Sequence, residues 1–186
     1  MRVIGGYARS LRLKTIESEG TRPTTDKIKE TLFNMLQNKI EHTRFLDLFA
    51  GSGAIGIEAL SRGATYACFV DMNRNAMECI KYNLEHTHLG EKAETITSDA
   101  VSALRRIESS SKEKFDIVFI DPPYNKNMED RALDYLKDSM LIDKDTLIIV
   151  EMSRESDSSH FDDMGYTIIK DKQYRSNKHI FLKRRL

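Results

Sequence analysis

From residue 43 onward, short apolar runs alternate with segments of helical spacing, and this alternation is the strongest constraint on the fold. Runs rich in β-branched and aromatic residues predict strands, whereas apolar residues three and four positions apart predict helices. Strands that alternate with helices are typical of βαβ units, which build a mostly parallel sheet. The expected strands are 43–50, 66–72, 94–100, 115–122 and 146–153, and the expected helices are 54–63, 74–87, 100–108 and 128–140.

Both ends of the chain depart from this alternation. Residues 165–174 and 177–184 predict two strands with no helix between them, so we expect an antiparallel hairpin at one edge of a seven-stranded sheet. Residues 3–16 predict two short strands joined by a turn. Residues 21–36 predict a loop that leads into a helix, and Thr25 is the expected N-cap of that helix.

Length and composition indicate an ordinary globular protein, with 186 residues of which 40% are hydrophobic and 31% charged. We expect a sheet domain over residues 41–186 and a hairpin and helix extension over residues 1–40, which is too small for a core of its own. No apolar run is long enough to span a membrane, and the first ten residues lack the apolar core of a signal peptide. We therefore predict a cytoplasmic protein that does not contact a membrane.

Cysteine and histidine show no spacing that suits a metal. Cys68 and Cys79 lie in a predicted strand and a predicted helix, and the absence of a C-x-x-C motif favours a reducing compartment. His86 and His88 are two positions apart, and side chains two positions apart on a helix point in different directions. The other histidines are scattered. We therefore predict no metal site and expect the histidines at the surface. They are His42, His86, His88, His160 and His179.

Charge is segregated along the chain, although the formal net charge is zero. Residues 1–14 hold four basic side chains and no acid, and residues 170–186 hold seven basic side chains and one acid. The middle of the chain is correspondingly acidic. If the two ends converged in space, they would form a positive surface that suits a nucleic-acid backbone.

The segment FLDLFAGSGAIG places Gly51, Gly53 and Gly56 between a predicted strand and a predicted helix. With Asp71 at the end of the next strand, this spacing matches a dinucleotide site, in which glycines let the ligand approach and the acid holds a ribose. Asp47 favours a different ligand, because a carboxylate at this strand end would repel a pyrophosphate but attract an ammonium and a sulfonium.

The acids at successive strand ends together indicate S-adenosylmethionine as the cofactor, since ligands of open α/β sheets bind at the carboxyl ends of the strands. We expect Asp47 near the methionine part, Asp71 on the ribose and Asp99 on the adenine amino group. The predicted cofactor-binding residues are Asp47, Ala50, Gly51, Ser52, Gly53, Asp71, Met72, Asp99 and Ala100.

The predicted strand 115–122 runs into the motif Asp-Pro-Pro-Tyr, which suits chemistry on an exocyclic amine. Such an amine is a weak nucleophile because its lone pair is conjugated into the base. Acceptors for its two N–H groups, the Asp121 carboxylate and the Pro122 carbonyl, would direct the lone pair towards a methyl donor. Tyr124 could stack on a base that has left its helix or loop. The predicted catalytic residues are Asp121, Pro122, Pro123 and Tyr124.

The segments TRPTTDKIKETLFNML, DLFAGSGAIGIEALSRGA, VDMNRNAMECIKYNL and DIVFIDPPYNK resemble the bacterial small-subunit 16S rRNA guanine-N2 methyltransferase family over nearly the whole chain. The resemblance implies the class I S-adenosylmethionine-dependent methyltransferase fold, which is Rossmann-like. It also implies a guanine amine of 16S rRNA as acceptor, in a small-subunit assembly particle. One departure is Tyr174, which is followed by Arg175 rather than by the glycine typical of that turn in the family.

Within the TRPT segment (residues 21–24), Arg22, Pro23 and Thr24 border the active site according to this resemblance. Arg22 suits an RNA phosphate or an acid of the sheet domain equally well, and basic residues of the N-terminal hairpin suit the RNA backbone or protection of a sheet edge. The predicted RNA-binding residues are Arg2, Arg9, Arg12, Lys14, Arg22 and Thr24.

Three other functions are compatible with parts of this pattern. An adenine-N6 methyltransferase of DNA or RNA would use the same acceptor geometry, although DPPY and the TRPT segment favour guanine. A nicotinamide-dependent oxidoreductase is supported by the glycine loop alone. A noncatalytic RNA-binding assembly factor could keep the fold without the activity.

Overall fold

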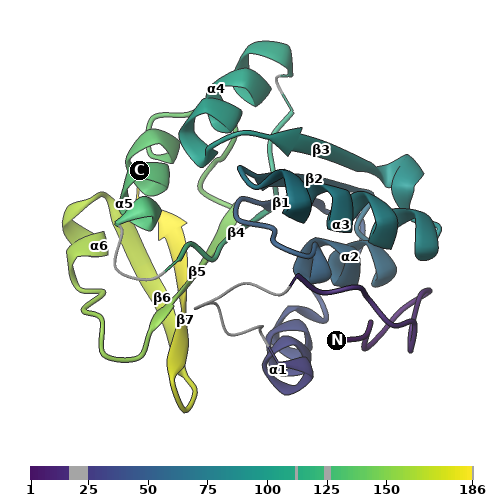
Figure 1. Cartoon of the computed structure of the whole chain (residues 1–186). Coiled ribbons are helices and arrows are strands. Elements are labelled where there is room, and N and C mark those ends of the chain that lie inside the picture. Colours follow the sequence, from purple (N-terminus) through teal and green to yellow (C-terminus); the bar gives the residue numbers. More distant parts are fainter. Residues whose placement is uncertain (17–24, 112, 124–126, 186) are drawn as a thin grey trace.

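A computed structural model describes residues 1–16, 25–111, 113–123 and 127–185, and it contains one sheet with helices on both faces (Figure 1). The strands are β1 (Arg44–Asp47), β2 (Tyr66–Asp71), β3 (Ala93–Thr97), β4 (Ile117–Ile120), β5 (Leu147–Ser153), β6 (Tyr166–Gln173) and β7 (Asn177–Arg184). The helices are α1 (Asp26–Leu36), α2 (Ala54–Ser61), α3 (Arg74–His86), α4 (Ala100–Ser110), α5 (Met128–Leu136) and α6 (His160–Asp163), with a 3₁₀ turn η1 (Gly90–Lys92).

The seven strands form a mixed sheet in the order β3-β2-β1-β4-β5-β7-β6. The five strands from β3 to β5 in this order are parallel, whereas β7 is antiparallel to both β5 and β6. This confirms the predicted mostly parallel sheet with an antiparallel hairpin at its edge. The short elements α6 and η1 were not predicted, because four and three residues carry too little periodicity.

Each face of the sheet is covered by its own set of helices. Alternate residues of β1 point to opposite faces, so Phe45 and Leu46 belong to different apolar clusters. Helices α1, α2 and α3 pack on the Phe45 face, and α4, α5 and α6 pack on the Leu46 face. Across the described residues, no helix has the length and apolar character that crossing a membrane requires.

The N-terminal segment packs on the sheet domain but forms less regular structure than expected. The two short strands predicted for residues 3–16 are absent, and a single antiparallel bridge between Arg2 and Arg12 closes the loop instead. Val3 and Leu13 are buried in the same cluster as Phe45, so the segment contributes to the core of the sheet domain. The loop can stay irregular because its N–H groups find partners on α2 as well as within the segment.

A buried ion pair fixes the N-terminal segment to α2. The Glu58 carboxylate is fully buried and accepts hydrogen bonds from the backbone N–H groups of Ile4 and Gly5, at 2.8 Å each. Lys29 of α1 is also fully buried, and its Nζ lies 3.3 Å from Glu58 and donates to the Arg2 carbonyl at 2.6 Å. The predicted N-cap of α1 is confirmed, because the Thr25 side chain accepts from the Ile28 N–H.

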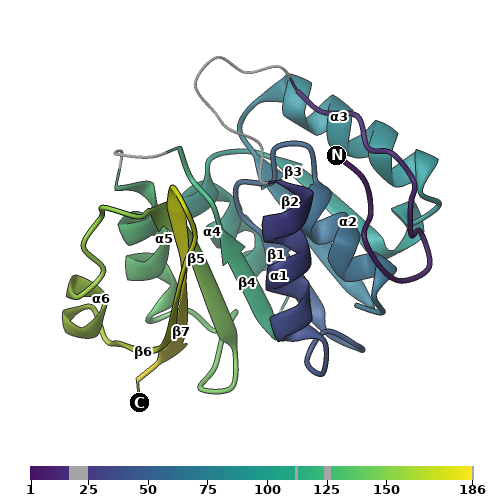
Figure 2. The ribbon, with the colours of Figure 1, turned by 90° about the horizontal axis from the view of Figure 1, so that it is seen from below.

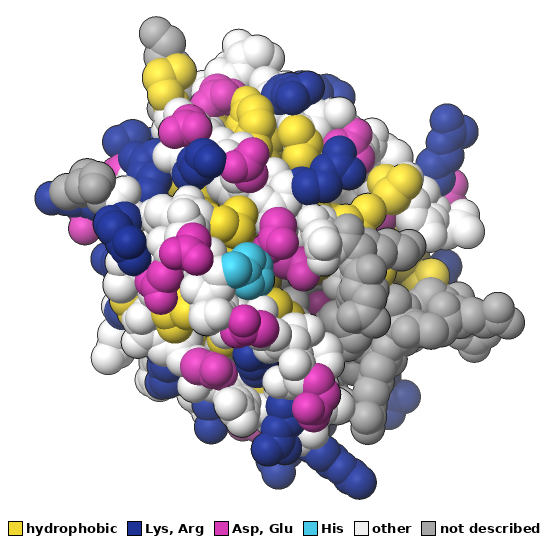
Figure 3. All heavy atoms as spheres, turned by 90° about the vertical axis from the view of Figure 1, so that its left-hand side faces the viewer, with side chains coloured by type: hydrophobic (Ala, Val, Ile, Leu, Met, Phe, Trp, Pro, Cys, Tyr) yellow, Lys and Arg dark blue, Asp and Glu magenta, His cyan; other side chains and the backbone are white. Residues whose placement is uncertain are grey.

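The two basic ends of the chain do not converge. The N-terminal segment lies along α2 and α3, whereas the C-terminal strands form the opposite edge of the sheet, and the two termini are well apart in both ribbon views (Figures 1 and 2). On the face over α5, α6 and β6, lysines and arginines are interspersed with acids (Figure 3). A joint positive surface built from both termini is therefore excluded.

Candidate active site

The predicted cofactor and catalytic acids lie at or just beyond the carboxyl ends of the parallel strands β1, β2, β3 and β4. Asp47 and Asp71 are the last residues of β1 and β2, and Asp121 directly follows β4. Because parallel strands share one direction, their carboxyl ends meet at the same end of the sheet. We call this end of the sheet the cofactor edge. The pairing of Asp47 with Phe119 of β4 places Asp121 two residues beyond Asp47 along this edge.

The glycine loop between β1 and α2 has open space above it. Gly51 and Gly53 have positive φ values of 54° and 76°, which favour glycine. A Cβ added at Gly51 would meet no atom within 4 Å, whereas a Cβ at Gly56 would approach the Phe69 ring to 2.3 Å. Gly51 therefore leaves room for a ligand, while Gly56 lets α2 pack closely on β2.

Asp47 serves α2 and shapes the charge of the site. Its carboxylate is buried and accepts from the Gly56 N–H at 3.1 Å, in the first turn of a helix whose N-cap residue Gly53 has no side chain to do so. Burial raises the pKa of Asp47 to about 7, against the lowering effect of that hydrogen bond, and the Asp71 charge adds to the rise. A carboxyl in this position can pair with a cation when it is ionised.

The two other predicted acids already accept backbone hydrogen bonds. Asp71 accepts from the Gly51 N–H at 2.9 Å and from the Asn73 N–H at 2.8 Å, and so holds the glycine loop against the end of β2. Asp99 is exposed and caps α4 through the Ser102 N–H at 3.0 Å, which lowers its pKa. Each carboxylate has lone pairs left over and can accept further hydrogen bonds. The contacts of Asp71 with the ribose and of Asp99 with the adenine amino group stay predictions.

The other residues predicted around the cofactor lie in the segments that directly follow these strand ends. Ala50 and Ala100 are buried, Ser52 is partly exposed, and Met72 is 67% exposed after the end of β2. The exposed Met72 side chain is free to pack on a flat ligand beside Asp71. Its predicted contact with adenine is untested.

Asp121 is half-buried and unusually basic for a carboxyl group. Burial raises its pKa well above the usual range, and the negative charges of Glu151 and Asp47 raise it further. An acid with a raised pKa is a better proton acceptor when ionised. This property suits the role predicted for Asp121 at an amine.

The remaining residues of the DPPY motif are only partly described. Pro122 is buried and Pro123 is exposed. Tyr124 lies outside the described residues, and its predicted stacking on a base stays a prediction. The same holds for Arg22 and Thr24 of the TRPT segment.

Sequence reasoning missed a polar cluster next to Asp121. Glu151 of β5 accepts from Asn177 Nδ2 at 2.6 Å and lies 2.9 Å from His179 Nε2. The other ring nitrogen of His179 is 3.1 Å from the Tyr174 hydroxyl. His179 is fully buried, so its predicted surface position is wrong. The available signal was Glu151 itself, the one charged residue in the predicted strand 146–153.

The predicted RNA-binding residues differ in their surroundings. Arg2, Arg9, Arg12 and Lys14 are all exposed, and Arg2 also lies 3.6 Å from the Asp26 carboxylate, which accepts its backbone N–H. A pair with an acid leaves Arg2 less available to a phosphate than the other three. None of these roles is tested by the structure.

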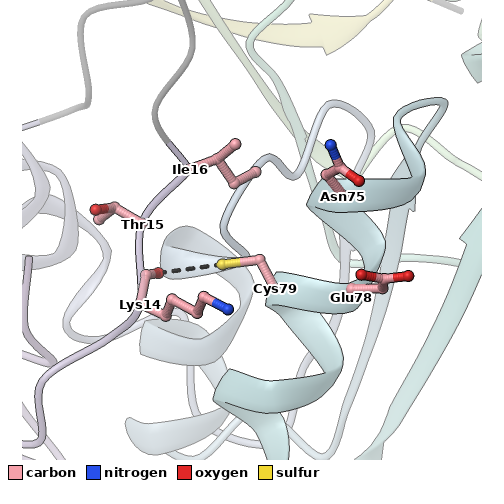
Figure 4. A pocket seen from close by; sticks show the side chains of 6 residues that line it. All are labelled: Lys14, Thr15, Ile16, Asn75, Glu78 and Cys79. Atoms are coloured by element: carbon pink, nitrogen blue, oxygen red, sulfur yellow. Dashed lines mark hydrogen bonds between the residues drawn. The ribbon is translucent and has the colours of Figure 1, made fainter.

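Lys14 approaches the cofactor side of the domain through α3. Asn83 accepts from the Lys14 N–H at 2.8 Å and donates to the carbonyls of Lys14 and Ser52, at 2.9 Å each. A small pocket lies between this part of the N-terminal segment and α3, and Cys79 Sγ contacts the Lys14 carbonyl there (Figure 4). Its lining residues are Lys14, Thr15, Ile16, Asn75, Glu78 and Cys79. This pocket contains none of the predicted cofactor acids.

The edge described above suits S-adenosylmethionine better than a dinucleotide. Gly51 offers open space at the strand-to-helix turn, and the acids Asp47 and Asp71 stand on either side of the glycine loop. Carboxylates attract an ammonium and a sulfonium but repel a pyrophosphate. The residues present therefore fit a cationic nucleoside.

Comparison with known proteins identifies the family. The model of the family described as Conserved hypothetical protein 95 matches residues 1–183. Ribosomal RNA small subunit methyltransferase D of Haemophilus influenzae is 36% identical over 173 residues, which cover 92% of this chain and 88% of that protein. The protein of the same name from Escherichia coli K12 is 38% identical over 156 residues, which cover 84% and 76%.

A solved structure from Escherichia coli, described as a candidate methyltransferase, is 33% identical and superposes with a TM-score of 0.82. The match covers 100% of this chain and 98% of that one. The fold is that of the class I methyltransferases, with the mixed seven-stranded sheet found here. The chain belongs to the Conserved hypothetical protein 95 family, which is the family of ribosomal RNA small subunit methyltransferase D.

Proposed function

We propose that the protein is an S-adenosylmethionine-dependent methyltransferase that modifies the exocyclic N2 amine of a guanine in 16S rRNA. The observation that carries this proposal is the position of Asp121, a carboxyl with a raised pKa one strand away from the acids and glycines of the cofactor edge. The small-subunit methyltransferases of the family support rRNA as the substrate. The protein works in the cytoplasm, where its buried free cysteines stay reduced.

When bound, S-adenosylmethionine supplies an electrophilic methyl group, and its sulfur keeps the electron pair of the bond that breaks. Asp47 and Asp71 hold the cationic and ribose parts, and the backbone of Gly51 leaves room for the ligand. Asp121 and the Pro122 carbonyl accept the two N–H groups of the amine and aim its lone pair. No covalent bond to the protein is needed.

The RNA is bound by positive side chains that flank this edge. Arg9, Arg12 and Lys14 are exposed on the N-terminal segment, and Asn83 ties the end of this segment to the glycine loop. Lysines and arginines of this kind contact phosphates without regard to sequence. The acceptor is a small-subunit assembly particle, in which the target base is still accessible.

The decisive experiment is transfer of a labelled methyl group to small subunits from a strain that lacks its own enzyme of this family, compared with naked 16S rRNA. Mass-spectrometric mapping should find N2-methylguanine at one position. Methylation at adenine N6 would contradict the assignment of guanine and identify adenine as the acceptor. Tight RNA binding without transfer would instead establish a noncatalytic binding protein.

Affinity for the cofactor should depend on pH through Asp47. The pKa of this group is about 7, and only the ionised form attracts a cation. The dissociation constant of S-adenosylmethionine should therefore rise by up to about tenfold per pH unit as the pH falls below this value. Calorimetry at several pH values tests this, and Asp47→Asn should bind weakly with little pH dependence. A pH-independent wild-type affinity would contradict the assignment of Asp47.

A further inference from the structure

A chain of polar side chains leads from the β6–β7 turn to the catalytic carboxyl. Glu151 and His179 face each other in the antiparallel pairing of β5 and β7, at hydrogen-bond distance. The register of β4 and β5 pairs Ile120 with Val150. The next residues on these two parallel strands are Asp121 and Glu151, which therefore stand side by side.

The hydrogen bonds of this chain fix the orientation of Glu151. A carboxylate only accepts, so His179 Nε2 and Asn177 Nδ2 donate to its two oxygens. Burial raises the pKa of Tyr174 to about 12, with a contribution from the Glu151 charge, so its hydroxyl keeps the proton and donates to His179 Nδ1. We call these three residues, Tyr174, His179 and Glu151, the relay chain.

The surroundings of Asp121 contain several ionisable groups in the described part of the protein. Asp47 faces it from the end of β1, and Glu151 faces it from β5. His179 on β7 and Tyr174 in the β6–β7 turn lie behind Glu151. Glu151 is buried and Asp121 is half-buried, so solvent screens the effect of the Glu151 charge on Asp121 only in part.

We propose that Glu151 is a positioning residue for the methyl transfer: fixed by the relay chain, its charge keeps Asp121 basic enough to take the proton that the amine releases. This inference rests on the proposed function. The amine nitrogen gains a methyl group and loses one proton, and that proton ends on a carboxylate oxygen of Asp121. In this proposal Glu151 acts through Asp121, which is the group that takes the proton.

The test is the pH profile of single-turnover transfer to hypomethylated small subunits by Glu151→Gln, which removes the charge but keeps the shape. Without its charged neighbour Asp121 becomes more acidic, so the acidic limb of the profile should move to lower pH by about one unit. The weaker base should also lower the plateau rate by about threefold. Carbon-13 NMR of the Asp121 carboxyl should show the same shift directly.

Glu108→Gln is the matched control, because this α4 carboxylate also accepts from several groups, Tyr135, Ser139 and the Met140 N–H, without facing Asp121. It should leave the pH profile in place. If Glu151→Gln does not fold, Glu151→Met must produce the same shift. An Asp121 titration that is unchanged in the charge-free variant overturns the inference, whereas absence of transfer by the wild type refutes the proposed function instead.

Discussion

Replacement of Asp121 by alanine should slow methyl transfer by at least about a hundredfold, a typical cost of removing a preorganised hydrogen-bonding group from an active site. The variant keeps the Pro122 carbonyl as one acceptor but loses the second acceptor and the group that takes the proton. Single-turnover transfer of labelled methyl groups measures the loss. Affinity for S-adenosylmethionine, measured by calorimetry, should change much less, because Asp47 and the glycine loop are intact.

The fold should not suffer from the loss of Asp121. The pKa of this carboxyl is raised in the folded protein, so its contribution to stability is fully present below the pKa of the unfolded chain and is lost as the pH rises towards the folded value. At neutral pH the group therefore does not favour folding. Asp121→Asn should accordingly melt at the same temperature as the wild type or higher, while it remains inactive.

Asp116 provides the matched control for Asp121. It lies just before β4, at the amino end of the same strand, where its carboxylate accepts from the Arg44 N–H at 2.7 Å. Asp116→Asn should change transfer little, because this end of the sheet is far from the cofactor edge. Near-normal turnover of Asp121→Ala would remove Asp121 from the chemistry.

The sheet could be predicted from the sequence because the signals that define it are local. Apolar periodicity marks each strand and helix without knowledge of its neighbours, and a parallel sheet then follows from the alternation. Residues 3–16 were predicted as two strands by the same rules, but many hydrogen-bond partners of this segment lie on α2 and α3. The groups that decide its conformation, above all Glu58, are more than fifty positions away in the sequence.

The sequence was sufficient to predict those acids of the candidate site that stand directly at the end of a predicted strand. Asp47, Asp71 and Asp121 each follow an apolar run directly, and parallel strands bring such ends together. Glu151 and His179 could not be paired in this way, since their contact depends on the register of two strands that are not adjacent in the sequence. The structural role of Asp99 as a helix cap was likewise hidden, because a cap and a ligand-binding acid occupy the same position.

Replacement of Glu58 by alanine should lower the free energy of unfolding by about 3–5 kcal/mol, the range for breaking a buried ion pair. The change leaves Lys29 buried without its counterion and leaves the N–H groups of Ile4 and Gly5 without their acceptor. Burial already lowers the pKa of Lys29, and Glu58 is the main group that opposes this effect. Urea unfolding measures the loss, which corresponds to a drop of about 6–20 °C in melting temperature.

Two comparisons separate this effect from an ordinary loss of charge. Glu113→Ala removes an exposed carboxylate from its 2.9 Å ion pair with the half-buried Arg44 and should cost no more than about 1 kcal/mol. Lys29→Met should cost much less in the Glu58→Ala background than in the wild type, because the orphaned charge is removed. In Glu58→Ala, amide exchange should accelerate first in residues 3–13, which this carboxylate holds against α2. A variant as stable as the wild type would mean that burial of the pair adds nothing to the docking of the N-terminal segment.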